Sequence, residues 1–205
     1  MGILRDLFGP SRDEIWSQFA AAVGGDFQAG GFWKGSRVDA KHGEWTVTLD
    51  TYTVSNGKTS TTYTRMRAPY VNPSGFRFKI YRQGVFSTIG KWFGMQDIQV
   101  GEPAFDEAFI IQANDEAAVQ QLLANDKIRE LAAVQPDIFF CVKDDENNFW
   151  TGLKFPPDTD ELYFQVTGVI RDAERLRLLY ELFAATLDEL CHLGAAYQSR
   201  PAVRL

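Results

Sequence analysis

Alternating hydrophobic and polar residues predict β-strands in the first half of the chain. The period is two across residues 44–81, and the tetrapeptide Ser-Asn-Gly-Lys at 55–58 has the residue types of a β-hairpin turn. A return strand over 62–67 follows, and we expect Pro69 to end it because proline cannot donate to a β-ladder. Strict alternation over 76–82 predicts a further strand. The pattern therefore indicates three consecutive antiparallel strands.

Helical spacing, preceded by capping residues, appears in three other regions. Ser11 and Glu14 form a capping box ahead of a helix that runs to about residue 23. Asn114-Asp115 and Asn125-Asp126 have side-chain oxygens that can accept from free first-turn amides, which predicts a pair of short helices. Asp172 caps the longest predicted helix, which extends to about Leu193.

The remaining apolar runs complete the predicted order of elements. Residues 105–111 alternate and predict a strand that leads into the helix pair, while residues 138–142, 149–155 and 162–169 predict a second antiparallel meander. The fold class is therefore α+β: antiparallel β meanders packed with an N-terminal helix, a central helix pair and a long C-terminal helix.

The same patterns divide the chain into two parts. We expect residues 1–10 to be a short amphipathic N-terminal segment, suited at most to weak peripheral membrane contact, and residues 11–205 to be a single α+β domain. Leu178 and Leu182 widen the apolar face of the last helix. That width suggests cover on two sides, by the chain's own sheet and by a loop or a second subunit, which is consistent with a homodimer.

The composition is that of a globular protein. The chain of 205 residues is 45% hydrophobic, and it lacks both the run of about 20 apolar residues that a transmembrane helix needs and the apolar core of an export signal. Cys141 lies in an apolar run, where a free thiol behaves as a small hydrophobic group. These features predict a soluble protein in the reducing cytoplasm.

Charge is distributed unevenly along the chain. Residues 1–100 hold 12 Lys and Arg against 8 Asp and Glu, and residues 101–205 hold 9 against 19, so the formal net charge of −6 combines halves of +4 and −10. The acidic total argues against general nucleic-acid binding. A local basic surface in the first half remains compatible with these numbers.

The predicted strands place cations on one face of the sheet. If the second and third strands pair, a ligand-binding surface would comprise Tyr63, Arg65, Arg67, Arg77 and Lys79. Such a surface would attract a phosphate-bearing ligand or an acidic protein partner, because guanidinium offers a planar pair of donors to such oxygens. The alternative is a solvated face whose cations pair with the acidic second half.

A second candidate is the glycine-flanked apolar stretch that contains Trp92, Phe93 and Met95. Large rigid side chains of this kind form partner-binding tips because they bury much area at low entropic cost. A loop folded back onto the core explains the same residues equally well.

Catalytic and metal-binding patterns are weak. Asp97, Glu102, Asp106 and Glu107 offer carboxylates for acid–base or metal chemistry, but their spacing does not make them converge, and exposed acids are common. His42 stands alone, and the sequence contains neither a Gly-x-Ser-x-Gly elbow nor a glycine-rich phosphate loop. We assign no catalytic residue, no metal and no cofactor.

Five segments together resemble a group of uncharacterised bacterial proteins along most of the chain: WTVTLDTYTV, YTRMRAP, FRFKIYR, GKWFGMQDIQVG and FDEAFIIQANDE. The resemblance implies a bacterial, cytoplasmic, single-domain protein. It implies no activity and no site residues.

These observations favour a non-enzymatic binding or scaffold domain that recognises a protein partner or an anionic ligand. One alternative is a metal-assisted hydrolase that uses Asp97, Asp106 and Glu107. Another is a carrier of an apolar small molecule, in which the long C-terminal helix lies over a curved sheet and encloses a cavity.

Overall fold

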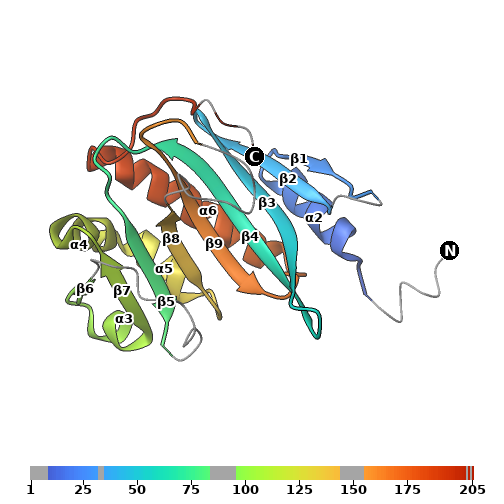
Figure 1. Cartoon of the computed structure of the whole chain (residues 1–205), viewed down its shortest axis with the longest axis horizontal. Coiled ribbons are helices and arrows are strands. Elements are labelled where there is room, and N and C mark those ends of the chain that lie inside the picture. The colour runs from blue at the N-terminus through green and yellow to red at the C-terminus, as the bar shows by residue number, and fades with distance from the viewer. Residues whose placement is uncertain (1–8, 32–34, 84–95, 144–154, 202, 204) are drawn as a thin grey trace.

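Nine antiparallel strands form one continuous sheet in the part of the chain that the structure describes (Figure 1). The computed structural model describes residues 9–31, 35–83, 96–143, 155–201, 203 and 205. The strands are β1 (Asp26–Gln28), β2 (Arg37–His42), β3 (Trp45–Ser55), β4 (Ser60–Val71), β5 (Phe78–Arg82), β6 (Gln96–Asp97), β7 (Phe109–Ala113), β8 (Phe139–Lys143) and β9 (Thr159–Thr167). The helices are α2 (Arg12–Ala22), α3 (Pro103–Ala108), α4 (Glu116–Ala124), α5 (Asp126–Ala133) and α6 (Ala173–His192). The predicted α+β class is confirmed.

The helix starts follow the capping residues that the sequence indicates. Ser11 accepts a hydrogen bond from the Glu14 amide, and the Glu14 carboxylate accepts one from the Ser11 amide, which completes the capping box of α2. Asp115, Asn125 and Asp172 accept from first-turn amides of α4, α5 and α6 respectively. Each cap satisfies backbone donors that have no partner inside the helix.

The order of strands across the sheet is β1-β2-β3-β4-β9-β8-β5-β7-β6. The β3–β4 hairpin forms as predicted and closes with Ser55 opposite Ser60. The third expected strand, β5, does not pair with β4, because β9 and β8 lie between them. The two halves of the chain therefore interleave within one sheet.

Two further predicted strands differ in the structure. Residues 103–108 form α3 rather than the start of a strand, and only residues 109–113 are extended. Pro103 occupies the first helical turn, where its missing N–H costs nothing, and this favours the helix. In the second meander β8 pairs directly with β9; the strand predicted at 149–155 lies outside the described residues except for Phe155, which is not in a strand.

Pro69 lies inside β4 instead of ending it. Alternate residues of a strand direct their backbone polar groups to opposite neighbours. The Asn72 amide donates to Asp158 on the β9 side, whereas the Val71 oxygen accepts from Tyr197 on the other side. By this alternation the Pro69 nitrogen faces the β3 side, where pairing between β3 and β4 has already ended at Arg67. The missing N–H therefore interrupts no ladder.

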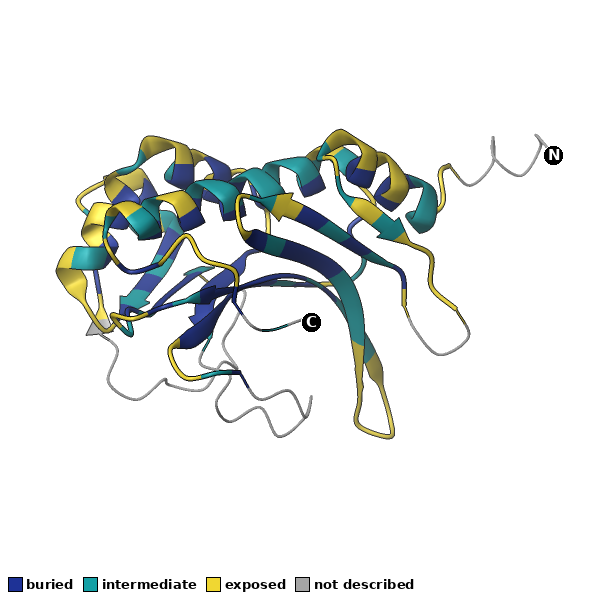
Figure 2. Cartoon of the chain, turned by 90° about the horizontal axis from the view of Figure 1, so that it is seen from above, coloured by how far each residue is buried: buried dark blue, intermediate teal, exposed yellow. Residues whose placement is uncertain are grey.

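The helices α2, α4, α5 and α6 lie over one face of the sheet (Figure 2). The core fills the layer between them, where Phe140 contacts both Phe78 and Phe183 with ring centres 5.6 and 5.4 Å apart. The wide apolar face of α6 is covered within the chain, since α2 and α5 pack beside it and Leu182 is fully buried. No helix in the described ranges is both long and apolar enough to cross a membrane.

We expect Leu179→Ala in α6 to lower the free energy of unfolding by about 2–5 kcal/mol, because the buried leucine leaves a cavity that its neighbours only partly fill. Leu178→Ala is the matched control, since Leu178 is only half-buried on the same helix. Urea unfolding measures both. An equal loss in the two variants would contradict this placement of α6.

Candidate functional site

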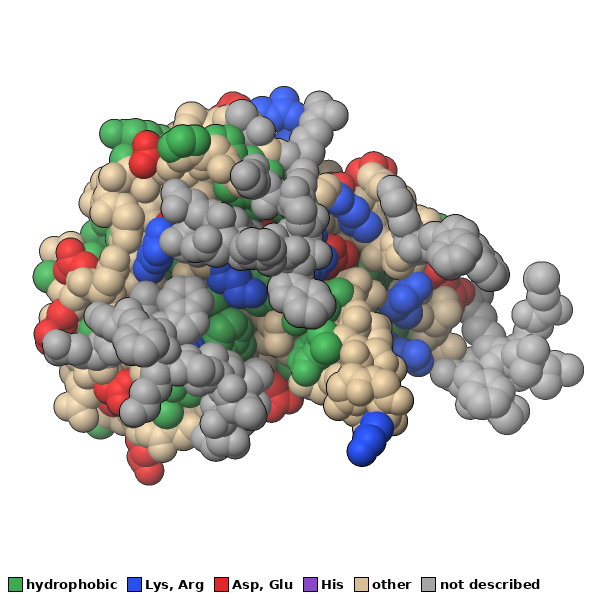
Figure 3. All heavy atoms as spheres, in the orientation of Figure 1, with side chains coloured by type: hydrophobic (Ala, Val, Ile, Leu, Met, Phe, Trp, Pro, Cys, Tyr) green, Lys and Arg blue, Asp and Glu red, His purple; other side chains and the backbone are tan. Residues whose placement is uncertain are grey.

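The sheet face opposite α2, α4, α5 and α6, which we call the helix-free face, carries most of the polar and charged side chains of the central strands. Its members alternate with residues of the hydrophobic core along each strand. They are Arg37, Asp39 and Lys41 of β2; Thr46, Thr48, Asp50 and Tyr52 of β3; Tyr63, Arg65 and Arg67 of β4; Lys79 and Tyr81 of β5; Phe139, Cys141 and Lys143 of β8; and Glu161, Tyr163 and Gln165 of β9. Figure 3 looks onto this face and shows Lys and Arg side chains distributed across it, with acidic groups among them.

At the centre of the helix-free face one carboxylate holds two arginines. Arg65 Nε and Nη2 donate to the two oxygens of Asp50 at 2.5 and 3.0 Å, and Arg67 Nη2 donates to Asp50 Oδ2 at 2.7 Å. Glu161 approaches Arg67 Nη1 at 3.7 Å. We call these four residues the Asp50 cluster. The β3–β4 register creates it, because Asp50 lies directly opposite Arg65.

The Asp50 cluster is partly withdrawn from water. Burial alone would lower the pKa of the Arg65 guanidinium, but its hydrogen bond and charge interaction with Asp50 outweigh burial and raise that pKa. The Arg67 side chain is 7% exposed, and its Nε has no hydrogen-bond partner. A buried donor without an acceptor is costly, so Asp50 and Glu161 satisfy the Arg67 guanidinium only in part.

Tyrosines lie next to the Asp50 cluster. The rings of Tyr52 and Tyr63 stack with their centres 5.2 Å apart, and the Arg65 guanidinium lies 4.9 Å from the Tyr52 ring centre. The hydroxyls of Tyr52 and Tyr163 both donate to Gln165 Oε1, at 2.5 and 2.7 Å. Burial raises the pKa of Tyr163 far above its usual range, so this hydroxyl stays a neutral donor.

Two lysines occupy the part of the helix-free face nearer β5. Lys79 Nζ lies 5.2 Å from the ring centre of Tyr81 and 5.9 Å from that of Phe139. Lys143 Nζ lies 3.1 Å from the ring centre of Tyr163. Lys79 is almost fully buried, and burial lowers the pKa of its ammonium group. Cation–π contacts offset part of the cost of burying these charges.

The structure brings together only some of the residues predicted to form the basic surface. Tyr63, Arg65 and Arg67 are neighbours on β4, but two strands separate them from Lys79, because β5 is not beside β4. Arg77 lies beyond the end of the sheet face, with its Nε 3.4 Å from Asp160. The ligand-binding role of the five residues stays a prediction.

Sequence reasoning missed Asp50, Glu161 and Lys143. A signal for Asp50 existed: closing the hairpin at Ser55 and Ser60 and counting back along both strands places Asp50 opposite Arg65. Glu161 and Lys143 come from distant segments, and no local pattern places them here. The predicted partner-binding residues Trp92, Phe93 and Met95 lie outside the described residues.

Two of the three carboxylates of the hydrolase hypothesis line one cavity. Asp97 and Asp106 line a cavity of about 500 Å³, whereas Glu107 does not line it. Asp106 accepts hydrogen bonds from the amides of Val100 and Gly101, and Asp97 accepts one from Gln112. Within the described ranges no three His, Cys, Asp or Glu side chains are grouped so that they could hold a metal ion.

Comparisons with known proteins show the fold but no family. No protein-family model matches the sequence, and a search of curated proteins gives no match. The crystal structure of the mycobacterial trehalose monomycolate transport factor A, TtfA, aligns over 94% of this chain and 98% of that chain with a TM-score of 0.53 and 8% sequence identity. At this identity the similarity shows a shared fold alone.

We expect Asp50→Asn to destabilise the protein by about 3 kcal/mol, because it leaves two arginines in a poorly solvated site without their shared carboxylate. Chemical denaturation measures the loss. Glu174→Gln, which removes a carboxylate from the exposed pair with Arg177, is the control and should leave the unfolding midpoint nearly unchanged. A small effect of Asp50→Asn would show that the Asp50 cluster does not stabilise the sheet.

We expect stability to fall as the pH rises above about 10, the ordinary pKa of tyrosine. Burial raises the pKa of Tyr52, Tyr70 and Tyr163, so the unfolded chain loses protons that the folded chain keeps, and unfolding becomes more favourable. Urea unfolding at pH 8 and pH 10.5 measures the loss. Tyr163→Phe should reduce this pH dependence, and the exposed Tyr197→Phe should not.

Proposed function

We propose that this protein is a non-enzymatic binding domain that recognises an anionic ligand or an acidic segment of a protein partner through the helix-free face. The Asp50 cluster carries the proposal. Asp50 already fixes Arg65 and Arg67 side by side. The two side chains therefore lose little conformational entropy when a ligand binds to them.

Charge on the helix-free face also supports the proposal. Its described residues include six cations, Arg37, Lys41, Arg65, Arg67, Lys79 and Lys143, against the three acids Asp39, Asp50 and Glu161, with Asp97 of β6 at the edge of the sheet. Among its described residues the face therefore has an excess of positive charge, on a chain whose formal net charge is −6. Because this face is positive while the chain as a whole is negative, electrostatic attraction directs an acidic partner toward this face rather than toward the rest of the surface.

The aromatic groups give the helix-free face a means of recognition besides charge. Tyr52 and Tyr63 present a stacked pair beside Arg65, and both are only half-buried. Rigid aromatic side chains next to arginine are typical of residues that dominate binding energy at interfaces. A shared fold with a transport factor is compatible with a binding role.

For the two alternative functions, the hydrolase and the carrier of an apolar molecule, we find no observation as specific as the Asp50 cluster among the described residues. The acids of the hydrolase hypothesis are engaged with backbone amides and Gln112 rather than with one another. For the carrier hypothesis, the layer between α6 and the sheet is occupied by packed side chains such as Phe140 and Phe183. We therefore favour the binding domain.

Binding of a fluorescein-labelled deca-glutamate peptide, measured by fluorescence anisotropy, tests the proposal. We expect saturable binding that weakens with salt. Arg65→Gln and Arg67→Gln should each weaken binding at least tenfold, since a hydrogen bond to a charged group contributes about 1.5–3 kcal/mol. Arg65→Lys keeps the charge but loses the paired donors, so we expect an intermediate loss.

Arg171→Gln is the matched control, because Arg171 is exposed and lies outside the helix-free face. This variant should bind the acidic peptide like the unmodified protein. Absence of binding, or equal weakening by Arg171→Gln and Arg67→Gln, would refute the proposed role of the Asp50 cluster. Thermal melts of each variant separate loss of binding from loss of folding.

A further inference from the structure

A groove opens where β3 and β4 separate. Their pairing ends at Thr48 and Arg67, whereas β4 continues beside β9 as far as Val71. Pro69 lies in this unpaired stretch and lines the groove. Its nitrogen faces the β3 side, and as a proline it has no N–H to donate to a β3 neighbour. The edge of β4 beyond Arg67 is therefore free of β3, in the middle of an otherwise continuous sheet.

The C-terminal segment of the chain lies in this groove. Gly194 adopts a positive φ of 70° after α6, and the chain then turns back so that the Tyr197 amide donates to the Val71 oxygen at 3.1 Å. This contact is an antiparallel bridge to the free edge of β4. The residues that follow reach the helix-free face, where Pro201 is buried.

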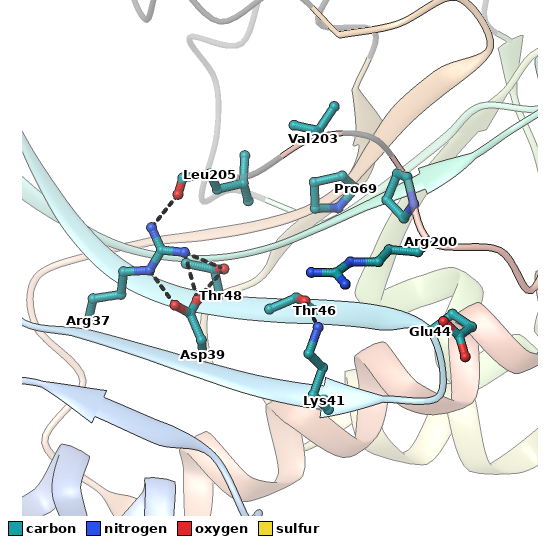
Figure 4. Close-up of a pocket in the computed structure, with 11 residues that line it drawn as sticks. Arg37, Asp39, Lys41, Glu44, Thr46, Thr48, Pro69, Arg200, Val203 and Leu205 are labelled. Atoms are coloured by element: carbon teal, nitrogen blue, oxygen red, sulfur yellow. Dashed lines mark hydrogen bonds and ion pairs between the residues drawn. The ribbon is translucent and has the colours of Figure 1, made fainter.

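Side chains of β2, β3 and the C-terminal segment line an open cavity of about 290 Å³ (Figure 4). Pro201, Val203 and Leu205, which are every second residue of the sequence, all line it. Thr46, Thr48 and Pro69 also line it. Space for further side-chain atoms therefore remains beside the segment.

Arg37 holds the segment by its main chain. Arg37 Nε and Nη2 donate to the two oxygens of Asp39 at 2.8 Å each, and Thr48 Oγ1 donates to Asp39 Oδ1 at 2.6 Å. This network fixes the guanidinium, whose Nη1 then donates to the main-chain oxygen of Leu205 (Figure 4). A contact of this kind reads the backbone of a peptide and does not require a particular side chain there.

We propose that this groove is the docking site for an extended peptide segment of a partner protein, and that the chain's own C-terminal segment, described at 197–201, 203 and 205, occupies it as an intramolecular competitor. The partner segment would add to the free edge of β4, place apolar side chains at alternate positions as Pro201, Val203 and Leu205 do, and offer a main-chain oxygen to Arg37. The inference rests on the proposed function, that the helix-free face binds a partner, but it uses residues outside the Asp50 cluster.

The test is the binding of a labelled synthetic peptide with the sequence of residues 197–205, YQSRPAVRL, measured by fluorescence anisotropy. The receptors are the full chain and a chain shortened after Ala196, which keeps the buried Ala195 and Ala196. The shortened chain should bind at least tenfold more tightly, because a segment that fills the groove in nine molecules of ten reduces apparent affinity by that factor.

Full-length Val203→Asp weakens the competitor without shortening the chain and should also bind the peptide more tightly.

In the shortened chain, Arg37→Gln should weaken peptide binding at least tenfold, and Arg171→Gln should not change it. Equal affinity of the peptide for the full chain, the shortened chain and Val203→Asp would overturn the inference, as would binding that is insensitive to Arg37→Gln or absent throughout. The deca-glutamate peptide distinguishes this failure from that of the proposed function, because its binding depends on Arg65 and Arg67. Thermal melts confirm that each variant is folded.

Discussion

The pairing of β4 with β9 is the constraint on which the rest of the structure depends. It extends over eight residue pairs, from Thr64 and Val166 to Val71 and Thr159, and it joins strands about 100 residues apart in the sequence. Leu162, Phe164 and Val166 of β9 are buried in the core beneath the helices. Without this pairing the hairpin β3–β4 and the strands around β5 would be separate sheets, each with an exposed edge.

Insertion of β9 and β8 between β4 and β5 also determines the chemistry of the helix-free face. It brings Glu161 beside Arg67 and aligns Tyr163 with Tyr52 through Gln165. The basic first half and the acidic second half therefore meet within one sheet. The two arginines are nevertheless held mainly by Asp50, which comes from their own hairpin, so the second half neutralises the basic surface only in part.

The two regions of the helix-free face that we propose as binding sites are built in the same way. In each, an acid that lies close in the sequence orients an arginine: Asp50 orients Arg65 across the β3–β4 hairpin, and Asp39 orients Arg37 along β2. An arginine fixed in this way keeps some of its donors for another molecule and has already lost its conformational freedom. The regions differ in their surroundings, because tyrosines flank Arg65 whereas an extended segment of the chain itself lies on Arg37.

The amino-acid sequence alone determined the features that depend on neighbours within about 20 residues. Helix caps at Ser11, Asp115 and Asp172 follow from hydrogen bonds between residues two or three apart, and the register of the β3–β4 hairpin follows from its turn. Only the tertiary structure decided which strands become neighbours, because alternation shows which face of a strand is buried but not which edge it pairs with. For that reason Lys79 lies apart from Arg65, Lys143 joins the helix-free face, and Pro69 becomes the place where the sheet opens rather than the place where a strand ends.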